Sequence, residues 1–164
     1  LNSAVICRNQ GTLVLISDIG RLLRLRITEE SMPLMGRLAQ GPMTMRLLPG
    51  EEIIGAVCTE QTPLTVFSQR GLIGRIDCSS LRYNERGDLG SMAVQVDAES
   101  DPLVGISACT GLIGVRTSKD RHGRLDPKEI NITKPGEKLS AQTSLQNEET
   151  IIEVINAIQP IPNP

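Results

Sequence analysis

The chain has 164 residues, of which 39% are apolar and 22% are charged, with a formal net charge of −2. This size and composition indicate a globular protein of one ordinary domain or a few small repeats. Phe67 and Tyr83 are its only aromatic residues, so the core must be aliphatic and base stacking offers little for single-stranded nucleic acid. The small net charge excludes a global field that attracts nucleic acid, so such binding would need a local basic patch. No apolar stretch is long enough to predict a membrane-spanning helix.

An internal repeat of about 50 residues dominates the sequence. Cys7, Cys58 and Cys109 are spaced by 51 residues, and each follows a short apolar run. A second strand-like run follows each cysteine. This run leads into a turn that ends in glycine, and an arginine-bearing strand follows the turn. We place these turns at residues 18–20, 69–71 and 121–123. Apolar runs bounded by turn residues predict strands.

Each unit continues with a loop, an alternating strand, an acidic turn and a closing apolar run. The first two units carry the alternating strand at residues 43–47 and 92–96, and the third has residues 138–145 without the loop glycines. Four strand-length segments per unit are typical of propeller blades, with a solenoid of β-sandwich units as the competing geometry. We therefore expect an all-β protein divided into the end of a preceding blade at 1–12, repeats at 13–62, 63–110 and 111–158, the last one degenerate, and a proline-rich tail at 159–164.

Two stretches carry a family resemblance. The first reads GRLAQG, then an alternating strand, then LLPGEEIIGAV, and the second reads VFSQRGLIGRID and continues to SDPLVGI. Both closely resemble a blade of the C-terminal domain of bacterial DNA gyrase A and of its paralogue in topoisomerase IV. The third unit, from VRTSKDRHGRL to ETIIEV, fits more weakly. The resemblance covers about residues 4–155 and implies a β-pinwheel, a propeller-like disc whose neighbouring blades exchange strands; three blades form about half of such a disc.

The resemblance also implies a function. In that family the domain wraps duplex DNA on a basic rim, a tyrosine in a separate domain breaks DNA, and the partner subunit hydrolyses ATP. This chain is then a non-catalytic DNA-binding domain without a cofactor, in a bacterial protein that is cytoplasmic and associated with the nucleoid, not with a membrane. Its expected partners are double-stranded DNA, the rest of the gyrase A-like protein and the ATPase subunit; the half disc leaves self-association open. The gyrase box, a Gln-Arg-Arg-Gly-Gly-Lys-Gly type heptad, is absent: residues 36–41 and 85–90 are degenerate versions, so gyrase and topoisomerase IV remain undistinguished. Because the chain starts at Leu1 without an initiator methionine or signal peptide, we expect a piece of a longer protein.

Arginines are the candidate DNA-binding residues, because a guanidinium offers forked donors to phosphate oxygens. Repeating one turn every 50 residues around a disc would place such donors along a curved path. The alternative is that they are ordinary solvated surface. The candidates are Arg21, Arg24, Arg26, Arg37, Arg46, Arg70, Arg75, Arg86, Arg121 and Arg124. We expect Arg24 and Arg26 to share one strand face.

Other reactive residue types give no catalytic or metal site. The three periodic cysteines are expected to be small buried residues, whereas Cys78, beside Asp77, is expected to be an exposed thiol, and no spacing suits zinc. Tyr83 occupies a loop position and His122 a turn position. The glycines in residues 71–74 and 111–114 fit strands better than nucleotide loops. A protein-interaction module without a DNA role and, less favoured, an enzyme in its own right are the competing functions.

Overall fold

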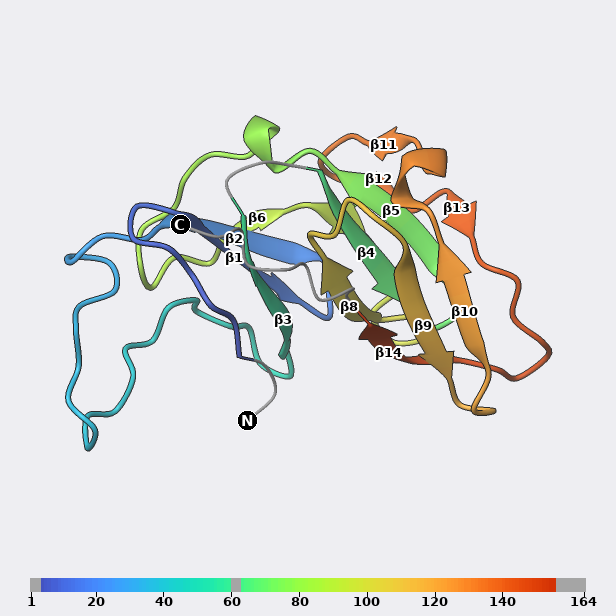
Figure 1. Cartoon of the computed structure of the whole chain (residues 1–164), viewed down its shortest axis with the longest axis horizontal. Helices are drawn as coiled ribbons and strands as arrows, with labels where there is room; N and C mark the ends of the chain where they lie inside the picture. The colour runs from blue at the N-terminus through green and yellow to red at the C-terminus, as the bar shows by residue number, and fades with distance from the viewer. Residues whose placement is uncertain (1–3, 60–62, 156–164) are drawn as a thin grey trace.

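The computed structural model describes residues 4–59 and 63–155 (Figure 1). In these residues the regular elements are short strands and two one-turn 3-10 helices, η1 (Cys78–Ser80) and η2 (Pro127–Glu129), with no α-helix. The predicted all-β fold class is therefore confirmed. The predicted tail at 159–164 lies outside the described residues.

Three blade-like sheets lie side by side in Figure 1. The first has the order β3-β1-β2-β6, built from β1 (Thr12–Ser17), β2 (Arg21–Arg26), β3 (Ile53–Cys58) and β6 (Ser91–Met92). The second is built around β4 (Leu64–Ser68), with β8 (Leu103–Ser107) on one side, β5 (Leu72–Ile76) on the other, and β11 (Ile132–Thr133) and β13 (Ala141–Gln142) on the far edge of β5. The third has the order β10-β9-β14, with β9 (Ile113–Thr117), β10 (His122–Leu125) and β14 (Ile151–Ile155). A short parallel pair joins β7 (Val94–Gln95) to β12 (Glu137–Lys138).

The sheets exchange strands between consecutive repeats, as the resemblance implies. Strand β6 belongs to the predicted second repeat but pairs with β2, matching Arg21 with Met92. Strand β13 belongs to the third repeat but pairs with β5, matching Leu72 with Gln142. Each of these sheets therefore extends beyond its predicted repeat, and the bounds 13–62, 63–110 and 111–158 stay a prediction.

The core follows from the central place of the first strand of each sheet. Strands β1 and β4 are buried at every residue because each lies between an inner and an outer neighbour. Phe67 is the largest fully buried side chain, and aliphatic residues fill most of the remaining core. The innermost strands approach closely at two glycines: a Cβ on Gly55 would lie 2.6 Å from Cγ2 of Ile106, and one on Gly105 would lie 2.3 Å from Cγ2 of Val154. A larger residue at either position would push neighbouring sheets apart.

The third turn differs from its prediction. Gly20 and Gly71 each have φ of +88°, and the equivalent position in the third sheet is Asp120, with φ of +56°. Aspartate tolerates this left-handed conformation better than most residues, so a glycine is not required. Placing the turn at residues 121–123 was therefore wrong, and His122 is the first residue of β10, not a turn residue.

The alternating strand predicted at residues 43–47 does not form a regular strand. Two backbone hydrogen bonds instead hold this segment against the next repeat: Gly87 N–H donates to Thr44 O (2.8 Å), and Arg46 N–H donates to Asp88 O (3.0 Å). Within the described residues, the equivalent segments of the later repeats lie on β2 and β5, whereas this segment has no preceding sheet to join. The prediction of a strand was wrong here because residues 43–47 pair with no strand among the described residues.

Candidate nucleic-acid interface

A buried carboxylate closes the turn between the first two strands of each sheet. A hydroxyl at the end of the first strand lies beside this carboxylate and accepts a hydrogen bond from the backbone N–H four residues later, at 3.2, 2.9 and 3.2 Å in chain order. Each carboxylate residue is no more than 7% exposed. The hydroxyl and carboxylate residues are Ser17 with Glu51, Ser68 with Asp101, and Thr117 with Glu149. The acidic turns noted in the sequence are thus structural. We call each hydroxyl–carboxylate pair, with the turn that it closes, a latch.

Arg21 belongs to the first latch. Its guanidinium donates from Nε to Glu51 Oε1 (2.9 Å) and from Nη2 to Glu51 Oε2, and the two side chains are 8% and 1% exposed. Burial would raise the pKa of Glu51, but hydrogen bonds from Arg21 and from Leu48 N–H outweigh it and lower that pKa. Because a buried carboxylate already accepts from its guanidinium, Arg21 does not present these donors to a DNA phosphate at the surface.

Arg121 makes the corresponding contact in the third latch but remains more accessible. Its Nη1 donates to Glu149 Oε2 (2.7 Å), with the arginine side chain 48% exposed and the glutamate side chain fully buried. The pKa of Glu149 is lowered, first by the hydrogen bond from Thr117 and then by the Gln146 N–H and the charge of Arg121. Arg121 therefore reaches solvent while anchored to the turn.

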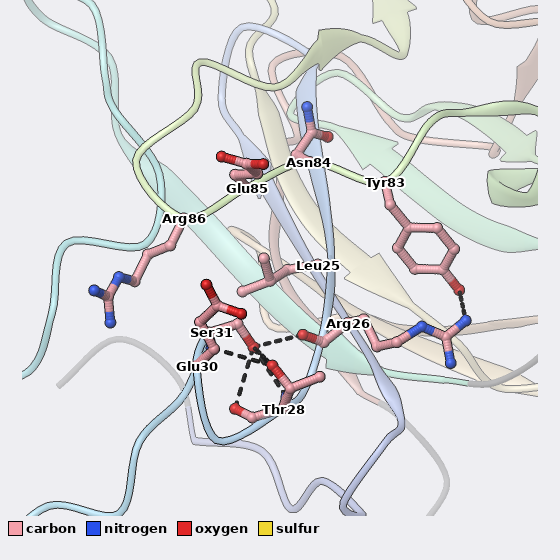
Figure 2. A pocket seen from close by; sticks show the side chains of 9 residues that line it. All are labelled: Leu25, Arg26, Thr28, Glu30, Ser31, Tyr83, Asn84, Glu85 and Arg86. Carbon is pink, nitrogen blue, oxygen red and sulfur yellow. Dashed lines mark hydrogen bonds between the residues drawn. The ribbon is translucent and has the colours of Figure 1, made fainter.

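Tyr83 holds two arginines of β2 in place (Figure 2). The Cζ atoms of Arg24 and Arg26 lie 4.0 and 4.9 Å from the centroid of its ring, and both side chains donate to its Oη, at 3.0 and 3.3 Å. A hydrogen bond with Thr12 lowers the pKa of Tyr83, as do the two positive charges, although partial burial opposes them. The shared face of Arg24 and Arg26 is confirmed. Sequence reasoning placed Tyr83 in a loop but missed this contact, since the two segments are about 60 residues apart.

Arg24 is a structural arginine in this cluster. Its Nη1 donates to the carbonyl oxygens of Cys78 and Leu81, both at 3.0 Å, and so ties β2 to the η1 turn of the next repeat. Arg26 is exposed and borders a pocket of about 350 Å³, whose other lining residues include Thr28, Ser31, Glu85 and Arg86. Figure 2 shows Arg26 and Arg86 on opposite sides of this pocket.

Most of the predicted arginines are exposed and form no ion pair in the described residues. Arg75 is half-buried on β5, at the position equivalent to Arg24. In the described part of the chain, the predicted arginines that are exposed and outside any ion pair are Arg26, Arg37, Arg46, Arg70, Arg86 and Arg124. Arg37 and Arg86 occupy equivalent loops 49 residues apart.

Cys78 is not the exposed thiol that its polar neighbours suggested. Its side chain is buried in the main apolar cluster at 1% exposure. Burial raises the pKa of this thiol to about 12, against the lowering effect of Arg24. Of the periodic cysteines, Cys109 is buried as predicted, while Cys7 and Cys58 are half-buried. The prediction for Cys78 was wrong because the η1 turn folds its side chain inward, a feature that polar neighbours in the sequence do not reveal.

Among known proteins, the chain is similar in sequence to A subunits of DNA gyrase. No protein-family model matches the chain. Over 106 residues, 64% of this chain, the sequence is 31% identical to the A subunit of DNA gyrase from Mycobacterium leprae and 29% identical to that from Mycolicibacterium smegmatis. The matched region is 8% and 13% of the length of those two proteins. No helix in the described residues has the length and apolarity needed to cross a bilayer.

Solved structures share the fold at low sequence identity. The C-terminal domain of DNA gyrase A superposes with a TM-score of 0.82 at 17% identity, over 93% of this chain and 53% of that one. The C-terminal domain of DNA topoisomerase IV superposes with a TM-score of 0.79 at 18% identity, over 90% of this chain and 46% of that one. The chain thus spans about half the length of these domains. Its fold is that of the C-terminal domains of DNA gyrase A and topoisomerase IV, and its sequence is similar to that of gyrase A.

Proposed function

We propose that this chain is a non-catalytic domain of a type IIA topoisomerase that binds and wraps double-stranded DNA through backbone phosphates. The observation that supports this most directly is that six of the predicted arginines are exposed and outside any ion pair of the described residues, on a fold shared with gyrase and topoisomerase IV domains. Guanidinium groups presented this way suit phosphate oxygens, and the scarcity of aromatic side chains argues against reading bases by stacking. The expected partners are the rest of a gyrase A-like protein and the ATPase subunit, in the bacterial cytoplasm.

The arrangement also explains how a chain of net charge −2 could bind DNA. Three of the acidic residues, Glu51, Asp101 and Glu149, are buried in the latches and point away from solvent, where two of them neutralise Arg21 and Arg121. The exposed surface is therefore less acidic than the total suggests. A protein-interaction module without a DNA role is the competing function, and the small net charge is what favours it.

Binding to duplex DNA is expected to weaken steeply with salt. If about five of these six exposed arginines neutralise phosphates, log K falls with log salt at a slope of about −4 to −5. Fluorescence anisotropy with a labelled duplex, from about 50 to 200 mM salt, measures this slope. A second duplex of unrelated sequence and equal length is the control and should bind equally well. A slope near zero, or no binding at about 50 mM salt, would leave the protein-interaction function as the better account.

A further inference from the structure

Arg26 stands at a position where the other two sheets have a carboxylate. The strand registers, counted from the latch hydroxyls, place Arg26, Asp77 and Asp126 at equivalent positions. The side chains of Asp77 and Asp126 cap the turns η1 and η2 by accepting from a backbone N–H. A guanidinium has no acceptor and cannot make such a cap. Capping a turn therefore does not explain why the first sheet has an arginine here.

Tyr83, which contacts this arginine, is itself anchored on β2. The next residue, Asn84, donates from its backbone N–H to Arg24 O (2.7 Å) and accepts at Oδ1 from Arg24 N–H (3.3 Å). The phenol oxygen accepts from Arg24 and Arg26 and lies 3.1 Å from Thr12 Oγ1. A phenol has one proton to donate, and because both arginines donate to its oxygen, Thr12 is the acceptor. The ring is therefore held in one orientation, with Arg26 against it.

The contact with Tyr83 also directs Arg26 away from two carboxylates. Glu30 and Glu85 line the same pocket as Arg26, but neither forms an ion pair with it in the described residues. Figure 2 shows the guanidinium pointing toward Tyr83 and away from both glutamates. The bond to Tyr83 Oη uses an N–H of Nη2, one of the five donors of a guanidinium. Tyr83 therefore fixes the direction of an exposed positive charge and leaves most of its donors for a ligand.

We propose that Tyr83 is a positioning residue for a DNA phosphate contact made by Arg26. The proposal rests on the proposed function, since it names how one of the six exposed arginines meets the duplex. Ordering a long side chain on binding costs conformational entropy, and an arginine already stacked on a ring has lost that freedom beforehand. An arginine paired with Glu30 or Glu85 would also have to break that pair before it could neutralise a phosphate. Tyr83 reduces both costs.

The DNA affinity of four chains tests whether Tyr83 acts through Arg26: the unsubstituted chain, Tyr83→Leu, Arg26→Ala and the double variant. Tyr83→Leu should weaken binding to a labelled duplex about 2- to 10-fold, the effect of having to order one arginine side chain. In the Arg26→Ala background the same change should have no further effect, because the two residues act as one unit. Equal losses with and without Arg26 overturn the proposal, since a merely structural tyrosine would weaken binding in both backgrounds. Tyr83→Phe keeps the ring and loses only the hydroxyl, so it should fold and lose less affinity than Tyr83→Leu.

Removing the competing carboxylates tests the direction of Arg26. Glu30→Gln with Glu85→Gln should strengthen DNA binding to some extent in any background, because two negative charges are lost. The gain should be larger when combined with Tyr83→Leu than in the otherwise unsubstituted chain, since Arg26 then lacks the ring that directs it away from these carboxylates. Equal gains in the two backgrounds overturn the inference that Tyr83 keeps Arg26 unpaired.

The tyrosine itself gives a readout that needs no DNA. Tyr83 is the only tyrosine and the chain has no tryptophan, so near-ultraviolet absorbance reports on this one ring. Thr12 first, and then the charges of Arg24 and Arg26, lower the pKa of Tyr83, so Arg26→Ala should raise that pKa in an absorbance titration. An unchanged pKa overturns the contact on which the proposal stands. Failure of the unsubstituted chain to bind duplex DNA at about 50 mM salt overturns the proposed function and this proposal with it, whereas binding that Tyr83→Leu leaves unchanged overturns only the positioning role.

Discussion

Replacing Glu51 with alanine is expected to destabilise the folded chain by about 3–5 kcal/mol, the cost of leaving one partner of a buried ion pair without the other. Arg21 would remain buried at 8% side-chain exposure with its main acceptor gone. Leu48 N–H would also lose its bond to Glu51 Oε2, which is 2.7 Å long. Urea unfolding followed by circular dichroism measures the loss.

Glu153→Ala is the matched control for this prediction. Glu153 accepts from Arg116 at 2.8 Å, but the two side chains are 50% and 38% exposed, so its loss should cost about 0–1 kcal/mol. Similar losses in the two variants would show that the buried latch does not contribute as described.

The Glu51 latch also predicts a pH dependence. Because folding lowers the pKa of Glu51, its stabilisation is fully present above the ordinary glutamate pKa and is lost as pH falls through the lowered one. The difference in unfolding free energy between the unsubstituted chain and Glu51→Ala should therefore narrow below about pH 4.5. A difference that widens under acid would contradict this sign.

Reversing the charge of Arg37 and Arg86 together is expected to abolish DNA binding. Both side chains are exposed, lie in equivalent loops and form no ion pair among the described residues. Each glutamate removes one attraction and adds one repulsion, so an affinity that starts in the micromolar range or weaker should fall below detection. Milder Arg37→Ala with Arg86→Ala should reduce the salt slope by about 2, or about 1 per phosphate contact. Anisotropy titration measures both effects.

Two lysines of the third repeat provide the control. Lys128 and Lys138 are also exposed, but their repeat keeps only one glycine of this loop, Gly136 at the position of Gly87, and Pro135 stands at the position of Arg86. Lys128→Glu with Lys138→Glu should weaken binding less than the arginine pair. All variants should keep their thermal midpoint, because exposed substitutions usually change stability by about half a kcal/mol or less. A larger effect from the lysine pair would move the DNA path away from the arginine loops, and an arginine pair that unfolds the chain would make those arginines structural.

The repeat made most of the fold predictable, because equivalent apolar runs recur where β1, β4 and β9 lie. The environment of individual polar residues was less predictable. Arg21 follows a glycine turn like a surface arginine, and only its long-range contact with Glu51, 30 residues away, buries it. Asp120 replaces a glycine in the left-handed conformation, so a search for glycine places the turn three residues too late. The burial of Arg21 depends on a long-range contact, and the position of the third turn depends on a backbone angle. The residues next to each position in the sequence do not reveal either one.

The exchange of strands also sets an order of events during synthesis. Strand β2 ends at Arg26, but the strand that completes its sheet begins at Ser91, 65 residues later. At about 5–20 residues per second, the ribosome needs about 3–13 s to make that interval. Through this time the outer edge of β2 is an unpaired strand edge, a surface on which nascent chains aggregate. Within this chain the first sheet is therefore synthesised before the second, but it is completed only after the second repeat has been made.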